Sequence, residues 1–154
     1  MNHTIPASAT RTSLATPALI ALGVLGVGTF QAMPVIVSAL SNSYSDPQIA
    51  RFSFVQLSAL SVGCVLSLVL SRWLSTRAMA LIALTLLCVC DGLAPFVPSF
   101  EAFIGVRALA GIGGGLAVAT TTAALARSVA PDRAFGWFLF CQIAFQMLAV
   151  WVLP

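Results

Sequence analysis

The stretch "VRALAGIGGGLAVAT", residues 106–120, decides the fold, because it places one arginine and four glycines in an otherwise apolar run. A glycine-rich run can indicate a phosphate-binding loop. The dinucleotide-binding fingerprint, however, follows a β-strand, whereas both flanks of this stretch are long and apolar. The run therefore does not predict nucleotide binding, and the composition of the chain indicates where it lies instead.

The composition indicates that the chain lies in a lipid bilayer. Of its 154 residues, 60% are hydrophobic and only 7% are charged. A soluble domain carries about 25% charged residues, and a small one leaves much of its surface in water. The net charge is +3, but the cations are single arginines spread along the chain. A nucleic-acid surface needs clustered cations, so we expect the bilayer and not nucleic acid as partner.

Five apolar stretches have the length of about 20 residues that a spanning helix needs: 14–40, 52–71, 78–97, 102–126 and 135–153. Helices satisfy their own backbone hydrogen bonds in lipid, and barrel strands would alternate in polarity. The sequence predicts an all-α, polytopic transmembrane helix bundle of about five spans over residues 14–154, after a polar tail at residues 1–13. Short connections predict that consecutive helices are antiparallel neighbours. A cleaved signal peptide is the alternative for the first stretch, which is longer than the about 7–15 apolar residues of such a peptide.

The arginines predict the orientation of the spans. With the N-terminus inside the cell, only Arg51 falls outside, while five arginines fall on the cytoplasmic side: Arg11, Arg72, Arg77, Arg127 and Arg133. This bias follows the positive-inside rule. We expect an integral protein of the bacterial inner membrane with a cytoplasmic N-terminus.

Arg107 lies inside the predicted fourth span. At 1.5 Å per residue its Cα is on the order of 10 Å below the membrane surface. The side chain either extends back to the headgroups or points into the bundle, where a charge indicates a functional site. Asp91 is the candidate partner, because an antiparallel hairpin would place the two at the same depth. The pair would either fix the hairpin or be made and broken with a proton, and an unpaired Asp91 would carry a proton itself.

The glycines after Arg107 predict close helix packing. Gly111 and Gly115 are four residues apart and share one face, whereas Gly113 lies on another. Small residues let the backbones of two membrane helices approach closely. Two interpretations remain open, which are static packing and packing that permits the helix to slide or bend.

Other polar residues lie within apolar runs. Gln31 is in the first span, and Gln142 and Gln146 are one turn apart in the fifth. An amide in lipid needs a partner, so these side chains either bond neighbouring helices or line a substrate cavity. The threonines at 120–122 are expected to bond the backbone of their own helix.

The pattern Arg107-x-x-x-Gly111-x-Gly113-x-Gly115 is similar to the fourth-helix motif R-x-x-x-G-x-G-x-G of the major facilitator superfamily. "MPVIVSAL" (33–40) resembles part of that family's first hairpin, and "VAPDRAFGWF" (129–138) resembles the entry to its fifth helix. The resemblance covers nearly all of the chain but only the first five of the family's usual twelve helices. It implies transport by alternating access, with Arg107 as the proton-coupling or anion-sensing charge of the cavity.

A second motif of the family is only partly present. Its loop motif G-x-x-x-D-R-x-G-R-R aligns with "SLVLSRWLSTR" (67–77), where Arg72 matches the first arginine and Ser71 replaces the aspartate. Arg77 keeps only the positive charge. The chain therefore lacks the carboxylate of the family's cytoplasmic charge latch.

The resemblance implies the N-terminal part of a proton-coupled small-molecule transporter, a symporter or an antiporter, with efflux favoured by "MPVIVSAL". The chain ends at "MLAVWVLP", so we expect the missing C-terminal half as a partner and no transport by the chain alone. The alternative is a small non-catalytic membrane subunit that packs against partner helices. We expect no enzyme, no metal and no cofactor, because His3 lies in the polar tail, the acids are dispersed and the cysteines show neither zinc spacing nor a disulfide framework.

Overall fold

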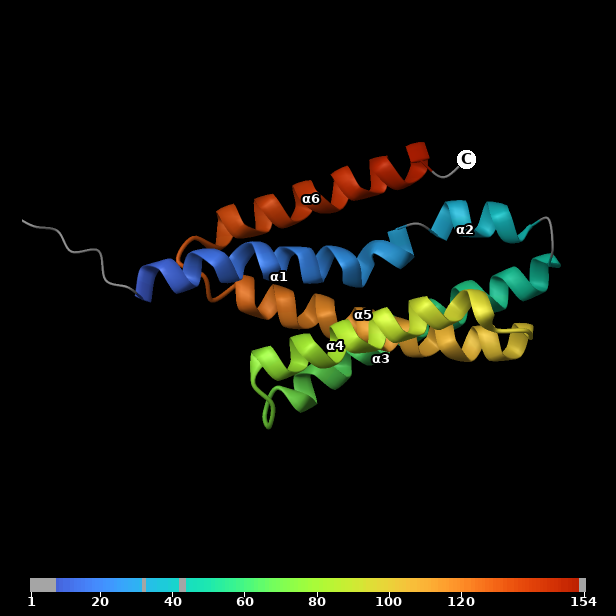
Figure 1. Ribbon diagram of the computed structural model, residues 1–154, viewed down its shortest axis with the longest axis horizontal. Helices are drawn as coiled ribbons and strands as arrows, with labels where there is room; N and C mark the ends of the chain where they lie inside the picture. Colours follow the sequence, from blue (N-terminus) through green and yellow to red (C-terminus); the bar gives the residue numbers. More distant parts are fainter. Residues whose placement is uncertain (1–7, 32, 42–43, 153–154) are drawn as a thin grey trace, which may run out of the picture.

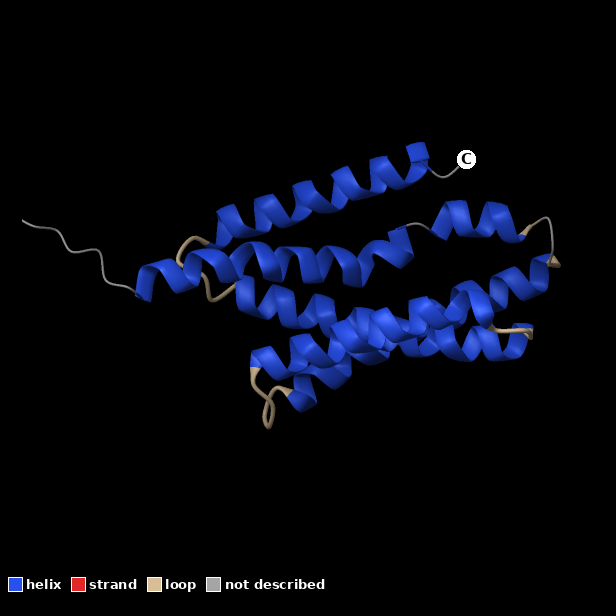
Figure 2. Cartoon of the chain, viewed as in Figure 1, coloured by secondary structure: helices blue, strands red, loops and turns tan. Residues whose placement is uncertain are grey.

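The computed structural model describes residues 8–31, 33–41 and 44–152, and this part of the chain is built of helices joined by short connections (Figure 2). The elements in chain order are α1 (Ser8–Gln31), α2 (Met33–Leu40), α3 (Asp46–Leu70), α4 (Thr76–Leu93), the 3-10 turn η1 (Ala94–Phe96), α5 (Phe100–Leu125) and α6 (Pro131–Val152). The predicted all-α class is confirmed.

Serines set the beginnings of the helices in the middle of the chain. The Oγ of Ser75 accepts a hydrogen bond from the N–H of Ala78 at the start of α4, and Ser99 caps α5 in the same way, both at 3.3 Å. Before α3, the backbone N–H of Ser45 donates to Oε1 of Gln48 at 3.0 Å. Each bond satisfies a polar group that the helix itself leaves unpaired.

Four helices in the described residues are long and apolar enough to cross a membrane, namely α3, α4 with η1, α5 and α6. They correspond to the predicted spans 52–71, 78–97, 102–126 and 135–153, and they identify the chain as an integral membrane protein. The predicted span 14–40 is represented by α1 and α2, on either side of residue 32, which lies outside the described residues. The apolar helical segment found there, Thr16–Gly28, is shorter.

Helix α1 begins at Ser8, within the predicted polar tail at 1–13. Hydropathy marks where a helix enters lipid and not where the helix begins. Residues 1–7 of that tail lie outside the described residues.

Helix α5 is central to the bundle and packs against α3, α4 and α1, while α6 packs mainly on α1 (Figure 1). Helices α1, α4 and α6 run in one direction, and α3 and α5 run in the other. Thus α3 and α4 are antiparallel as predicted, but each makes its main contacts with α5 and not with the other. The order of packing follows from the small residues of α5.

The interior combines small and large apolar side chains, and the outer surface is apolar. Ala83 and Ala117 are fully buried where α4 and α5 meet, beside Leu87. Large apolar side chains on the outside, such as Phe54 and Leu68, are exposed. Such a surface is stable only against lipid or other apolar helices.

Cations gather at one end of the bundle. Arg72 lies in the α3–α4 connection and Arg77 at the start of α4, whereas Arg127 lies in the α5–α6 connection and Arg133 at the start of α6. Both connections lie at the left end in Figure 1. Arg51 lies near the start of α3, at the opposite end. The arrangement agrees with the predicted grouping of arginines on one side.

Candidate functional site

An ion pair joins α4 and α5 within the span region. Nη1 of Arg107 donates to Oδ1 of Asp91 at 2.9 Å, and the two side chains are 15% and 41% exposed. Arg107 follows the first residue of α5, Phe100, by seven positions, which is about 10 Å along the axis. The guanidinium therefore points to the neighbouring helix α4. Its partner there is Asp91, the residue that the sequence placed at the same depth as Arg107.

Aromatic rings complete the surroundings of Arg107. Its guanidinium carbon lies 5.5 Å from the centroid of the Phe103 ring, a cation–π distance. Phe103 in turn stacks on the buried Phe52 of α3 at 5.6 Å between centroids. The Nε of Arg107 is buried and has no hydrogen-bond partner in the described part of the chain. The guanidinium of Arg107 thus has one donor that the described part of the chain leaves without an acceptor.

A second ion pair differs in its setting. Arg51 bonds Glu101 through two hydrogen bonds of 2.7 and 3.1 Å, but the side chains are 57% and 67% exposed. It joins the ends of α3 and α5 at the surface, where solvent screens the charges. This pair serves as the natural comparison for Arg107–Asp91.

Each glycine of "GIGGG" faces a specific neighbour of α5. A methyl group on Gly111 would lie 2.9 Å from Cβ of Ala59 in α3, and Gly115 faces the backbone of the same helix. A methyl group on Gly113 would meet Leu86 of α4 at 3.2 Å, so the predicted division of these glycines between two faces is confirmed.

Gly114 opens a third face that the sequence did not reveal. A methyl group there would lie 2.5 Å from the carbonyl oxygen of Gly26 in α1. Gly63 of α3 was also missed, although a methyl group on it would lie 3.0 Å from Cα of Gly115. Gly63 is a single glycine in its apolar run, so no motif marks it, whereas Gly26 lies between Gly23 and Gly28, a spacing that was available as a signal.

The predicted glutamines do not gather around Arg107. Gln31 ends α1, whereas Gln142 and Gln146 lie on α6 and are partly buried and exposed, respectively. Among the described residues, no hydrogen bond joins them to one another or to Arg107, and the buried Oε1 of Gln31 has no partner. These residues belong to the α1–α6 side of the bundle, and Arg107 reaches toward α4.

Gln56 of α3 was not singled out from the sequence. Its side chain is only 3% exposed, and its Oε1 has no hydrogen-bond partner in the described structure. The backbone carbonyl oxygen of Gln56 would lie 3.0 Å from a methyl group on Gly111. Gln56 therefore lies beside α5 about one helical turn from Arg107. The sequence signal that could have identified Gln56 is that it is a single amide side chain in the apolar run 52–71.

The threonines of α5 divide into local and interhelical roles. Thr122 bonds the carbonyl oxygens of Val118 and Ala119, as predicted. Thr121, which is fully buried, instead donates to the carbonyl oxygen of Leu19 in α1 at 3.0 Å. The buried Oγ1 of Thr120 has no partner among the residues described.

The remaining candidates lie apart from this pair. Arg72 and Arg77 are exposed at the arginine-rich end. The cysteines, all within the described ranges, are free, and these ranges contain no group of three or more His, Cys, Asp or Glu side chains able to hold a metal ion.

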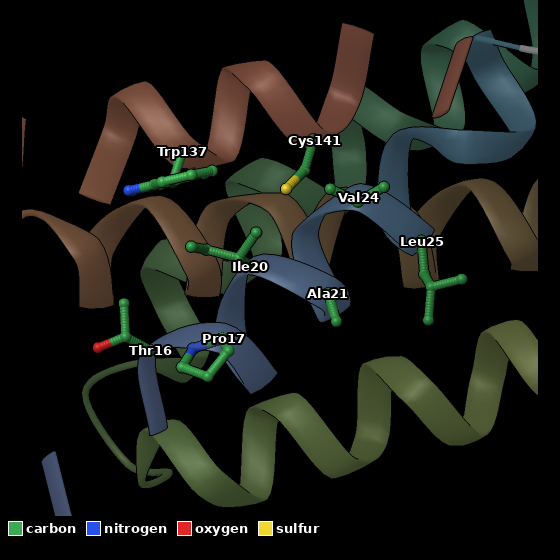
Figure 3. Close-up of a pocket in the computed structure, with 8 residues that line it drawn as sticks. All are labelled: Thr16, Pro17, Ile20, Ala21, Val24, Leu25, Trp137 and Cys141. Carbon is green, nitrogen blue, oxygen red and sulfur yellow. The ribbon is translucent and has the colours of Figure 1, made fainter. Parts of the chain in front are cut away.

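An open apolar groove of about 680 Å³ lies along α1 and α6. Figure 3 shows Ile20 and Val24 of α1 beside Trp137 and Cys141 of α6 along this groove. It contains no residue of the Arg107–Asp91 site.

In the described residues, the geometry therefore offers a largely buried arginine paired with an aspartate away from the start of α5, beside glycines of this helix that face three neighbours. Comparisons of the chain with protein-family models, with curated proteins and with solved structures find no match.

Proposed function

We propose that the chain forms the first helices of a secondary active transporter that moves a small molecule by alternating access, coupled to protons. The observation that carries the proposal is the Arg107–Asp91 ion pair within two spanning helices. Charged side chains in spans are costly and mark ion and substrate pathways. The match of residues 107–115 to the fourth-helix motif of the major facilitator superfamily supports the same interpretation.

The unsatisfied Nε of Arg107 supports a role in coupling. Nε is buried without a partner in the described residues, while Nη1 is held by Asp91. On this proposal, protonation of Asp91 or arrival of an anionic group exchanges the partner of the guanidinium. The exchange changes how strongly α4 is held to α5.

Helix α5 suits such a change. At Gly115 its close neighbours in α3 are backbone atoms, and at Gly111 they are the Cβ of Ala59 and backbone atoms. Small residues of this kind let two helices approach closely, and on this proposal α5 moves relative to α3 along this contact.

The test works with an unidentified substrate. Inverted membrane vesicles from cells that express the complete gene are acidified by respiration, and acridine orange reports the pH gradient. A panel of cationic, anionic and neutral compounds is added one by one. We expect at least one compound to dissipate the gradient, and we expect Arg107→Ala to abolish this response while membrane insertion is unchanged.

The matched control is Arg51→Ala, which removes the exposed pair and should leave the response intact. A full response in the Arg107→Ala vesicles would exclude the coupling role. The 154-residue chain reconstituted alone in liposomes is expected to give no flux, and flux driven by a pH gradient would show that no further helices are needed.

A second function, a non-catalytic membrane subunit that packs against partner helices, is favoured by the α1–α6 side. Helix α6 contacts mainly α1, and its outer side chains, including Phe140 and Met147, are exposed. Either lipid or the apolar face of a partner helix can cover such a surface, so an experiment must distinguish the two. Co-purification of a second membrane protein in mild detergent, lost on Trp137→Ala in the α1–α6 groove, would favour the subunit.

A further inference from the structure

A second groove, of about 430 Å³, lies between α1 and α4. Leu19 and Leu22 of α1 and Leu81 and Leu84 of α4 give it an apolar floor, and Thr76 and Arg77 lie at one end of it. Its volume is within the range of about 300–1,000 Å³ that is typical of small-molecule sites. The groove is therefore apolar along its length and cationic at its mouth.

The charge at the mouth has no counterpart in the described part of the protein. Arg77 is exposed and forms no ion pair with any of the residues described. The arginine-rich end contains Arg72, Arg127 and Arg133 as well, and the acid found there is Asp132 at the start of α6. An exposed guanidinium without an ion pair, at the edge of a spanning helix, can accept an anion from outside the chain.

We propose that this groove binds one acidic phospholipid, with an acyl chain along the leucines and the phosphate at Arg77. A guanidinium presents a planar fork of donors that fits phosphate oxygens. Basic pockets between spanning helices on the cytoplasmic side are sites for anionic headgroups. From Arg77 to Leu84 the groove follows α4 for about 10 Å, which matches the part of an acyl chain next to its headgroup.

The lipid also fills a gap in the packing. Helices α1 and α4 make few direct contacts with each other, since each packs mainly on α5. An acyl chain between them joins the two helices on the side away from α5. The bound lipid therefore stabilises the bundle whether or not the chain takes part in transport.

The experiment uses the full 154-residue chain, purified in mild detergent and studied by native mass spectrometry. Dioleoyl phosphatidylglycerol and dioleoyl phosphatidylcholine are added separately, so that only the headgroup differs. We expect the wild type to retain phosphatidylglycerol preferentially, and Arg77→Ala to weaken its binding about fivefold, the effect of about one interfacial arginine.

Three further variants make the result specific. Arg133→Ala removes the same charge from the same end but outside the groove, and we expect a change below about twofold. Arg77→Lys should restore part of the affinity. Ala18→Trp fills the groove, of which Ala18 forms part, and keeps the charge, so it should lower retention of both lipids.

The proposal is overturned if phosphatidylglycerol and phosphatidylcholine bind equally, or if Arg77→Ala and Arg133→Ala weaken binding to the same extent. It is also overturned if Ala18→Trp leaves retention unchanged, or if a co-purified protein occupies the groove and is displaced by this substitution. Size-exclusion chromatography serves as the control that each variant is folded. Lipid retention is measured without any transport assay, so its outcome is independent of the proposed function.

Discussion

Gly63 of α3 and Gly115 of α5 face each other so closely that a methyl group on Gly63 would lie 3.0 Å from Cα of Gly115. A methyl group on Gly115 would in turn meet the carbonyl oxygen of Leu60 and lie 2.8 Å from the amide nitrogen of Cys64. These are backbone atoms, which cannot move aside as a flexible side chain can. The two helices can pack at this separation only while both positions are glycine.

Gly115→Ala is therefore expected to lower the free energy of unfolding by about 3 kcal/mol, at the upper end for an overpacked core. The measurement is equilibrium unfolding by SDS in mixed micelles. Gly105→Ala, on the same helix with no atom within 4 Å of the added methyl, should change it by no more than about 1 kcal/mol, toward greater stability. Equal stabilities of the two variants would contradict the close approach of α3 and α5.

The two ion pairs are expected to contribute unequally to stability. Double-mutant cycles with Arg107→Gln and Asp91→Asn should give a coupling of about 1 kcal/mol, because the guanidinium is largely buried. Cycles with Arg51→Gln and Glu101→Gln should give less than about 0.5 kcal/mol, because both side chains are exposed. A larger coupling for the Arg51 pair would reverse this assignment.

Thr121 is expected to stabilise the contact between α5 and α1. Thr121→Val keeps the volume but removes the bond to the carbonyl oxygen of Leu19, which should cost about 0.6–1.7 kcal/mol in a membrane protein. Thr122→Val removes only bonds within α5 and should cost less. The same SDS titration compares the two variants, and an equal cost would argue against the interhelical role of Thr121.

The arginine-rich end is expected to face the cytoplasm, following the positive-inside rule. In a variant without the native cysteines, Trp73→Cys and Phe96→Cys place single thiols at exposed positions near opposite ends of α4. A membrane-impermeant maleimide should label residue 96 in intact spheroplasts and residue 73 only after lysis. Labelling of residue 73 in intact spheroplasts would invert the orientation.

The sequence was sufficient to predict the four long apolar helices α3 to α6, because their apolar runs are long and uninterrupted, whereas the predicted span 14–40 corresponds to two helices, α1 and α2. It also predicted that Asp91 and Arg107 meet, since a short turn fixes the register of two antiparallel helices. The helix boundaries were less accurate: α3 begins at Asp46 and not at residue 52. There the bonds between Ser45 and Gln48 begin the helix before the apolar run does.

Contacts between helices that are distant in sequence were beyond prediction. Gly63 and Gln56 were not recognised because each is a single residue whose role depends on which helix faces it. Conversely, Gln142 and Gln146 look like a polar stripe in the sequence, yet α6 packs mainly on α1 and leaves Gln146 exposed. Periodicity identifies the face of a helix but not its neighbour.

The central place of α5 has a consequence for biogenesis. Since α1, α3 and α4 all make their main interhelical contacts with α5, the segments synthesised earlier have little to bind while they leave the translocon. We expect them to remain loosely associated in the membrane until residues 100–125 have been synthesised. Helix α6 then adds to α1, and we expect a nascent chain arrested before Gly111 to be degraded by membrane proteases.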